Sequence, residues 1–261
     1  MQPGPRVLVV IPAYNEQDTV GATIAEIRAT NPGVDLLVVD DGSSDATAAV
    51  AREAGAEVAQ LPFNLGVGGA MRTGYRHAVQ GGYDVAVQID ADGQHDPRYL
   101  PELVARLGGP EQVGLVIGAR FAGEGEPYRV GAMRALAMKV LARTLSRMAR
   151  TRLTDVTSGF RVADRRTLTL FAAHYPAEYL GDTVESTVIA IRAGCRVTQV
   201  PVQMRLRQGG VASQTPFRAA LYLARAVVAL SLALVRRWPE TPPPPPGVRA
   251  EAARVHREEQ P

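Results

Sequence analysis

Cysteine and lysine are almost absent from this sequence of 261 residues, and histidine is sparse. Cys195 is the one cysteine, so the chain has no disulfide framework and no cysteine-based metal site, and a reducing compartment fits this composition. The four histidines show no metal-ligand spacing. Lys139 is the only lysine, and arginine makes up the other basic residues. Genomic base composition by itself can produce a preference for arginine over lysine. The arginines are therefore no indication of nucleic-acid binding, and we expect no nucleic-acid partner.

Long hydrophobic runs are also missing. Near the C-terminus a largely apolar run covers residues 226–235, which is ten residues, whereas about 20 are needed to span a bilayer. A strand-like run, Val7–Ile11, begins almost at the first residue and leaves no room for a signal peptide. We therefore expect a cytoplasmic protein that is peripheral at the inner face of the membrane.

Acidic and basic residues are unevenly distributed, although the net charge is only +3. Residues 1–119 contain 7 arginines against 15 acids, a net charge of −8. Residues 120–154 contain 8 basic residues against 2 acids (+6), and residues 192–238 contain 8 arginines and no acid (+8). The acidic part suits a metal ion, and the basic segments suit phosphate or an anionic membrane surface.

Short apolar segments alternate with helical segments over the first 120 residues. The expected strands are 7–11, 36–39, 58–61, 85–89 and 115–117, with helices between them. These strands are continuously apolar rather than alternating, which is typical of a parallel sheet covered by helices. We predict an α/β fold with a mostly parallel sheet flanked by helices, in one domain over residues 1–215.

Three oxygen-bearing side chains follow the strand over residues 85–89. Asp90, Asp92 and Gln94 stand at alternate positions, and their oxygens can converge on Mg²⁺ or Mn²⁺, which usually shares its ligands with substrate phosphates. The carboxyl end of a strand is also where open α/β sheets bind ligands. By itself the pattern also fits a solvated acidic turn.

Four motifs together resemble glycosyltransferase family 2, whose members have the Rossmann-like GT-A fold, and two further motifs narrow this resemblance to one branch. The six motifs are VIPAYNE (10–16), VVDDGSSD (38–45), Asn64 with Gly66 and Gly68, DADGQ (90–94), TSGFR (157–161) and VPV (200–202). The last two are similar to the branch that includes dolichol-phosphate mannose synthase, which transfers a sugar to a polyprenyl phosphate. The resemblance covers roughly residues 6–215.

The resemblance implies a donor site and a metal site. The residues near the nucleotide would be Pro12, Ala13, Tyr14, Glu16, Asp41, Asp90 and Ala91. Asp90, Asp92 and Gln94 match the metal-binding positions, and Asp92 would also be catalytic because the metal stabilises the departing nucleoside diphosphate.

An acceptor site follows from the same resemblance. The residues that could contact its phosphate are Arg120, Arg134, Ser158, Arg161, Arg205 and Arg207, and a guanidinium fork matches phosphate oxygens. Ser158 and Arg161 could instead be purely structural. Related lipid-phosphate transferases usually have Gly-x-Ser-Lys after these arginines, whereas this chain has Ala212 and Ser213. Because of this difference, the sequence does not decide the identity of the acceptor.

An acidic residue is expected near the nucleophile. Glu185 falls where related synthases have an acid, and Asp182 is the near alternative. A phosphate acceptor is already ionised at neutral pH, so this carboxylate would orient the reactants rather than remove a proton.

The C-terminal part has two expected segments. Residues 216–239 form an amphipathic helix with an arginine stripe, which suits either the membrane interface or packing on the domain or on a second subunit. Residues 240–261 include five consecutive prolines and read as a disordered tail.

We therefore predict an inverting, metal-dependent glycosyltransferase. Its donor is a GDP- or UDP-linked sugar and its acceptor a lipid-linked phosphate. One alternative is the same chemistry on a saccharide, protein or small-molecule acceptor, and another is a nucleotide-sugar-binding module without turnover.

Overall fold

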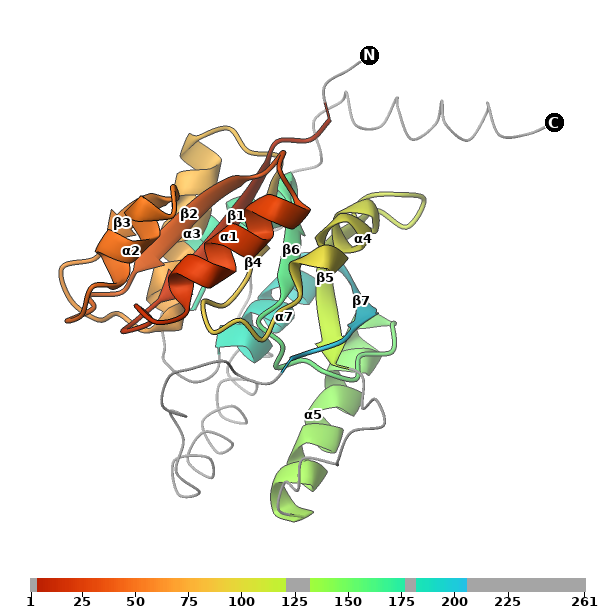
Figure 1. Ribbon diagram of the computed structural model, residues 1–261. Helices are drawn as coiled ribbons and strands as arrows, with labels where there is room; N and C mark the ends of the chain where they lie inside the picture. The colour runs from red at the N-terminus through yellow and green to blue at the C-terminus, as the bar shows by residue number, and fades with distance from the viewer. Residues whose placement is uncertain (1–3, 121–131, 177–181, 206–261) are drawn as a thin grey trace.

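The computed structural model describes residues 4–120, 132–176 and 182–205, and seven of its strands form one sheet (Figure 1). The strands are β1 (Val7–Ala13), β2 (Asp35–Asp40), β3 (Glu57–Gln60), β4 (Val85–Gln88), β5 (Val113–Arg120), β6 (Arg161–Asp164) and β7 (Arg196–Val202). The helices are α1 (Val20–Thr30), α2 (Thr47–Glu53), α3 (Val67–Gln80), α4 (Leu100–Ala105), α5 (Ala132–Ala149), α6 (Arg165–His174) and α7 (Asp182–Arg192), with a 3-10 turn, η1, at Pro97–Tyr99.

The strand order is β3-β2-β1-β4-β6-β5-β7. β1 lies between β2 and β4 and pairs with both in parallel. The chain runs from β1 to β2 and β3 on one side, then returns to β4 on the other side, so the strand order reverses beside β1. In open α/β sheets a ligand binds at the carboxyl ends of the strands at such a reversal.

β6 is antiparallel to both of its neighbours, β4 and β5. This strand was not expected from the sequence, because four residues that follow a glycine-containing loop give little periodicity. The predicted α/β class with a mostly parallel sheet is nevertheless confirmed.

Alternate side chains of the strands enter two apolar layers. Val9 and Ile11 of β1 pack with buried residues of α1, α2 and α4, whereas Leu8 and Val10 pack with those of α3, α5, α6 and α7. The sheet is therefore buried on both faces, which explains why its strands are continuously apolar. Gly74 permits close packing of α3 on β1, since a Cβ atom there would lie 2.3 Å from a Val10 methyl carbon.

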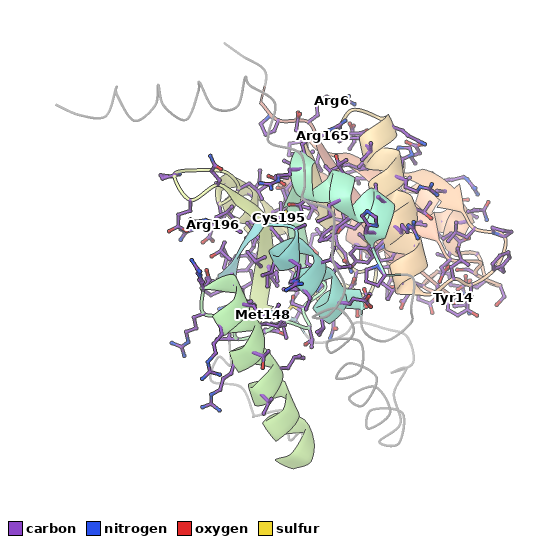
Figure 2. The ribbon with its side chains drawn as sticks, turned by 180° about the vertical axis from the view of Figure 1, so that it is seen from behind. Arg6, Tyr14, Met148, Arg165, Cys195 and Arg196 are labelled. Atoms are coloured by element: carbon purple, nitrogen blue, oxygen red, sulfur yellow. The ribbon has the colours of Figure 1, made fainter. Side chains whose placement is uncertain are left out.

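Helix α5 projects beyond the sheet, as the two opposite views in Figures 1 and 2 show. Leu141 and Leu145 pack in the core, while Arg143, Arg147 and Val140 are exposed. Among the described ranges, no helix is both long enough and apolar enough to cross a membrane. The predicted segments 216–239 and 240–261 lie outside the described residues.

Candidate active site

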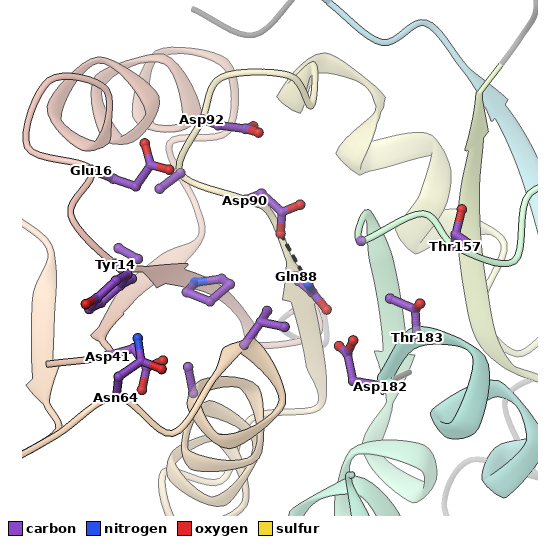
Figure 3. A pocket seen from close by; sticks show the side chains of 16 residues that line it. Tyr14, Glu16, Asp41, Asn64, Gln88, Asp90, Asp92, Thr157, Asp182 and Thr183 are labelled. Atoms are coloured by element: carbon purple, nitrogen blue, oxygen red, sulfur yellow. Dashed lines mark hydrogen bonds between the residues drawn. The ribbon is translucent and has the colours of Figure 1, made fainter. Parts of the chain in front are cut away.

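A cavity of about 340 Å³ opens at the carboxyl ends of β1, β2 and β4 (Figure 3). It is lined by Pro12, Ala13, Tyr14, Glu16, Asp41, Asn64, Val67, Ala70, Gln88, Asp90, Ala91, Asp92, Thr157, Gly159, Asp182 and Thr183. The structure thus brings together every residue that the sequence placed near the nucleotide. Figure 3 shows Tyr14, Asp41 and Asn64 at one end, Thr157, Asp182 and Thr183 at the other, and Asp90 between them.

The loops after β1 and β2 form the first end and are hydrogen-bonded to each other. The Asp41 N–H donates to the Ala13 carbonyl at 2.8 Å, and the Ser44 N–H donates to Asn15 Oδ1 at 2.9 Å. Asn15 has a φ of 54°, a left-handed conformation that asparagine tolerates better than most residues. Adjacent parallel strands therefore present one continuous wall to a ligand.

Two neighbouring acids have different roles in this wall. Asp40 is buried and accepts from the Ser43 N–H at 3.1 Å and from Gln60 at 3.2 Å, so it supports the loop. Asp41 lines the cavity and accepts from the Leu65 N–H at 2.7 Å. Burial raises the pKa of the Asp41 carboxyl, although backbone N–H groups oppose the shift.

The loop after β4 is held in shape by its own side chains. The Asp90 N–H donates to His95 Nδ1 at 3.1 Å, and the Gln94 N–H donates to Asp92 Oδ1 at 3.1 Å. The His95 ring is buried and stacks on Phe160, with ring centroids 5.2 Å apart. Gly93 has a φ of 72°, which most side chains would disfavour. Asp90 and Asp92 are thus fixed on the cavity wall.

The cavity wall carries carboxylate oxygens, the ligands that a hard divalent cation prefers. Of its described lining residues five are acids, namely Glu16, Asp41, Asp90, Asp92 and Asp182, and none is basic. Within the described ranges, no cluster of three His, Cys, Asp or Glu side chains could by itself hold a metal. Two carboxylates that leave positions for substrate phosphates are typical of Mg²⁺ sites. Gln94, the third predicted ligand, is not among the lining residues.

The second end of the cavity comes from α7 and from the loop before β6. Asp182 is buried, lines the cavity and accepts from the Tyr175 hydroxyl at 3.3 Å. Burial raises the pKa of its carboxyl. Glu185, about one helical turn later, is not among the lining residues. The structure therefore places Asp182, rather than the preferred Glu185, at the cavity.

Arg161 and Ser158 lie beneath this end and are both fully buried. The Arg161 guanidinium donates to the carbonyls of Ser158 and Val156 at 2.8 and 3.0 Å, and to the Ser186 and Thr187 hydroxyls at 2.9 and 3.2 Å. It therefore joins the loop before β6 to α7. These contacts agree with the alternative that Ser158 and Arg161 have a purely structural role.

Of the other predicted phosphate-binding arginines, only Arg205 has a described side chain, and it is not among the lining residues of the cavity. Arg205 pairs with Glu26 at 2.7 Å and with Asp96 at 3.1 Å. Arg120 ends β5 and Arg134 lies on α5, and neither side chain belongs to the described part. Arg207 lies outside the described residues, so its predicted contact stays a prediction.

Several lining residues were not assigned a role from the sequence. They are Asn64, Val67, Ala70, Gln88, Thr157, Gly159 and Thr183. Of these, Gln88 could have been found most readily from the sequence, because it is a polar residue in an otherwise apolar buried strand. Its Nε2 donates to Asp90 Oδ1 at 3.2 Å, while its buried Oε1 has no partner among the described residues.

Comparisons with known proteins give matches in sequence and in structure. The family model "Glycosyl transferase family 2" matches residues 8–170. The chain is 33% identical to undecaprenyl-phosphate mannosyltransferase of Micrococcus luteus, over 78% of this chain and 86% of that protein. It is 30% identical to polyprenol monophosphomannose synthase of Mycolicibacterium smegmatis, over 82% and 83% of the two chains.

A solved structure supports the fold. Glucosyl-3-phosphoglycerate synthase from Mycobacterium tuberculosis, in complex with Mn²⁺ and UDP-glucose, is similar with a TM-score of 0.66 and 26% identity. The similarity covers 88% of this chain and 79% of that one. This likeness agrees with the predicted GT-A architecture.

Proposed function

The chain belongs to glycosyl transferase family 2 and is a glycosyltransferase; from this premise we propose that it transfers a hexose from a nucleoside-diphosphate sugar to a polyprenyl phosphate, with inversion and with a divalent metal. The observation that supports this most is the order of groups along the cavity. The end with Tyr14, Asp41 and Asn64, the carboxylates of Asp90 and Asp92, and the buried carboxylate of Asp182 all line this one cavity (Figure 3).

The charge of the cavity supports the metal. A diphosphate is repelled by a wall with five acids and no described basic residue, so its binding requires a cation to offset like charges. Asp90 and Asp92, with Gln94 from the same loop, would hold Mg²⁺ or Mn²⁺. When bound, the metal would stabilise the charge that develops on the leaving diphosphate.

The protein's own groups would position the reactants. Tyr14, Asp41 and Asn64 would hold the nucleoside, which leaves the sugar between Asp90 and Asp182. An acceptor phosphate oxygen would form a bond to C1 of the sugar as the bond from C1 to the diphosphate breaks. Because that oxygen is already ionised, Asp182 would orient the sugar or the acceptor rather than take a proton.

The acceptor is proposed from the relatives. Two proteins that match most of this chain are named for undecaprenyl-phosphate and polyprenol monophosphate chemistry. Their names also make a mannose donor the first to test. The exposed arginines of α5, Arg143 and Arg147, give one face of the molecule a charge that suits an anionic inner membrane surface.

A direct assay tests the proposal. The purified chain would be incubated with undecaprenyl phosphate, with Mn²⁺ or Mg²⁺, and in turn with GDP-mannose, UDP-glucose and UDP-N-acetylglucosamine. We expect a glycolipid from one donor, lost with EDTA and in Asp92→Ala. Product formed only on 3-phosphoglycerate or a saccharide would replace the lipid acceptor. Donor binding without turnover on any acceptor would instead indicate a binding module.

A further inference from the structure

The chain after β7 is fastened to the loop that carries the candidate metal ligands. His95 and Met204 form an isolated antiparallel bridge, and the Arg205 N–H donates to the Gln94 carbonyl at 2.9 Å. This contact places Arg205 beside residues 91–96 although it comes from the far end of the sheet.

The Arg205 guanidinium forms ion pairs with two carboxylates from different parts of the chain. Its two Nη atoms each lie 2.7 Å from an oxygen of Glu26 on α1, and Nη2 lies 3.1 Å from Asp96 Oδ2. A bidentate pair of this kind fixes both distance and orientation. The side chains of Arg205 and Glu26 are only 28% and 34% exposed, so water weakens the pair less than at a fully exposed site.

Helix α1 holds the same loop at a second point. The Thr23 hydroxyl donates to the Ala91 carbonyl at 3.0 Å, and Glu26 lies one turn further along the helix. The loop from Ala91 to Asp96 is therefore clamped between α1 and the segment after β7. Glu26 belongs to none of the sequence motifs, and only the fold brings it next to Arg205.

We propose that Glu26 and Arg205 are positioning residues whose ion pair holds residues 91–96 in the conformation that places Asp92 on the cavity wall, where it would hold a divalent cation. The inference rests on the proposed function only in taking this loop as the metal-binding loop. It gives Arg205 a role other than the acceptor-phosphate contact expected from the sequence, because a phosphate would first have to displace a carboxylate from the guanidinium.

Hydrogen exchange of the ligand-free protein provides the first test. We expect faster exchange in peptides covering residues 90–96 for Arg205→Ala and for Glu26→Ala. Arg98→Ala is the matched control, because Arg98 also pairs with Asp96 but its side chain is 68% exposed. Unchanged exchange in both variants would overturn the proposal.

Calorimetry with Mn²⁺ and GDP or UDP, without acceptor, provides the second test. Each single variant should weaken binding by about 10-fold, as loss of a partner of a metal ligand does. The double variant should bind the Mn²⁺–nucleotide about as weakly as the weaker-binding single variant does, because both substitutions remove the same ion pair. Independent effects that multiply in the double variant would contradict a shared ion pair.

An acceptor-contact role gives a different result. If Arg205→Ala raises only the KM for polyprenyl phosphate and leaves nucleotide affinity unchanged, Arg205 binds the acceptor and the proposal is wrong. If the wild type binds no Mn²⁺–nucleotide, the proposed function fails, while the exchange test still decides the ion pair. Arg205→Lys and Glu26→Gln provide the same comparisons should an alanine variant fail to fold.

Discussion

The two ends of the cavity are built differently. The end at which we propose that the nucleoside binds comes from loops after β1 and β2, which are adjacent parallel strands, and hydrogen bonds such as that from Asp41 N–H to the Ala13 carbonyl join them. The opposite end combines Gly159, from the loop before the antiparallel β6, with Asp182 at the start of α7. Buried Arg161 joins those two elements. The first end therefore follows from sheet order, and the second depends on tertiary packing.

The difference has a functional consequence. In the proposed function, residues at the first end would bind the donor equally in the ground state and in the transition state, so their substitution should change KM more than kcat. Residues between the ends and at the second end lie where the bond changes would occur, so their loss should lower kcat. Four substitutions test this division, in order of decreasing expected effect.

Asp92→Ala should have the largest effect, because Asp92 belongs to neither end and would hold the metal shared by both. We expect turnover to fall about 100- to 1000-fold, the size of effect seen when stabilisation of a developing charge is lost. Steady-state assays over a range of Mn²⁺ concentrations measure it. Asp18→Asn, a change at an exposed acid, is the control and should behave as wild type.

Asp182→Asn should lower kcat by about 100-fold, as expected for a group that orients the reactants, with little change in donor KM. Glu185→Gln is the matched comparison on the same helix and should have a much smaller effect. The reverse ranking would restore Glu185 as the important carboxylate. Because burial raises the pKa of Asp182, wild-type activity should rise with pH through that pKa.

The same pKa shift predicts how stability depends on pH. The folded chain keeps the Asp182 proton to a higher pH than the unfolded chain does, so this group's contribution to stability falls as pH rises between the two pKa values. Above the pKa of the folded state it should change no further. Thermal or urea unfolding of the wild type and Asp182→Asn over the acidic range measures the difference, and a parallel dependence in both would contradict it.

Gly159→Ala should lower kcat by about 10- to 100-fold, comparable to the loss of a partner of a metal ligand. A Cβ atom there would lie 2.8 Å from Asp90 Oδ2 and 3.2 Å from Gln88 Nε2, so the carboxylate must move. Gly33→Ala, where a Cβ would have no neighbour within 4 Å, is the control. Equal activity of the two variants would show that Asp90 can shift without cost.

Asp41→Asn should have the smallest effect and should act on binding. We expect the donor KM to rise about 10-fold, equivalent to about 1.4 kcal/mol, while kcat stays near the wild-type value. Calorimetric titration with the nucleoside diphosphate should show the same loss. A large fall in kcat would mean that the nucleoside end also takes part in the chemistry, and the division between the two ends would not hold.

The sequence alone determined the sheet and the side of it on which we propose that the donor binds. Continuous apolar strands predicted the α/β sheet, and the acids directly after the strand over residues 85–89 predicted a ligand site at its carboxyl end. The resemblance to glycosyltransferase family 2 added Tyr14 and Asp41 to the same predicted site. Tertiary structure alone decided the opposite side. The position of Asp182 rather than Glu185 at the cavity, the burial of Arg161 and the pairing of Arg205 with Glu26 depend on contacts between residues far apart in the chain. Local periodicity reports which face of an element is buried, but not which distant element covers it.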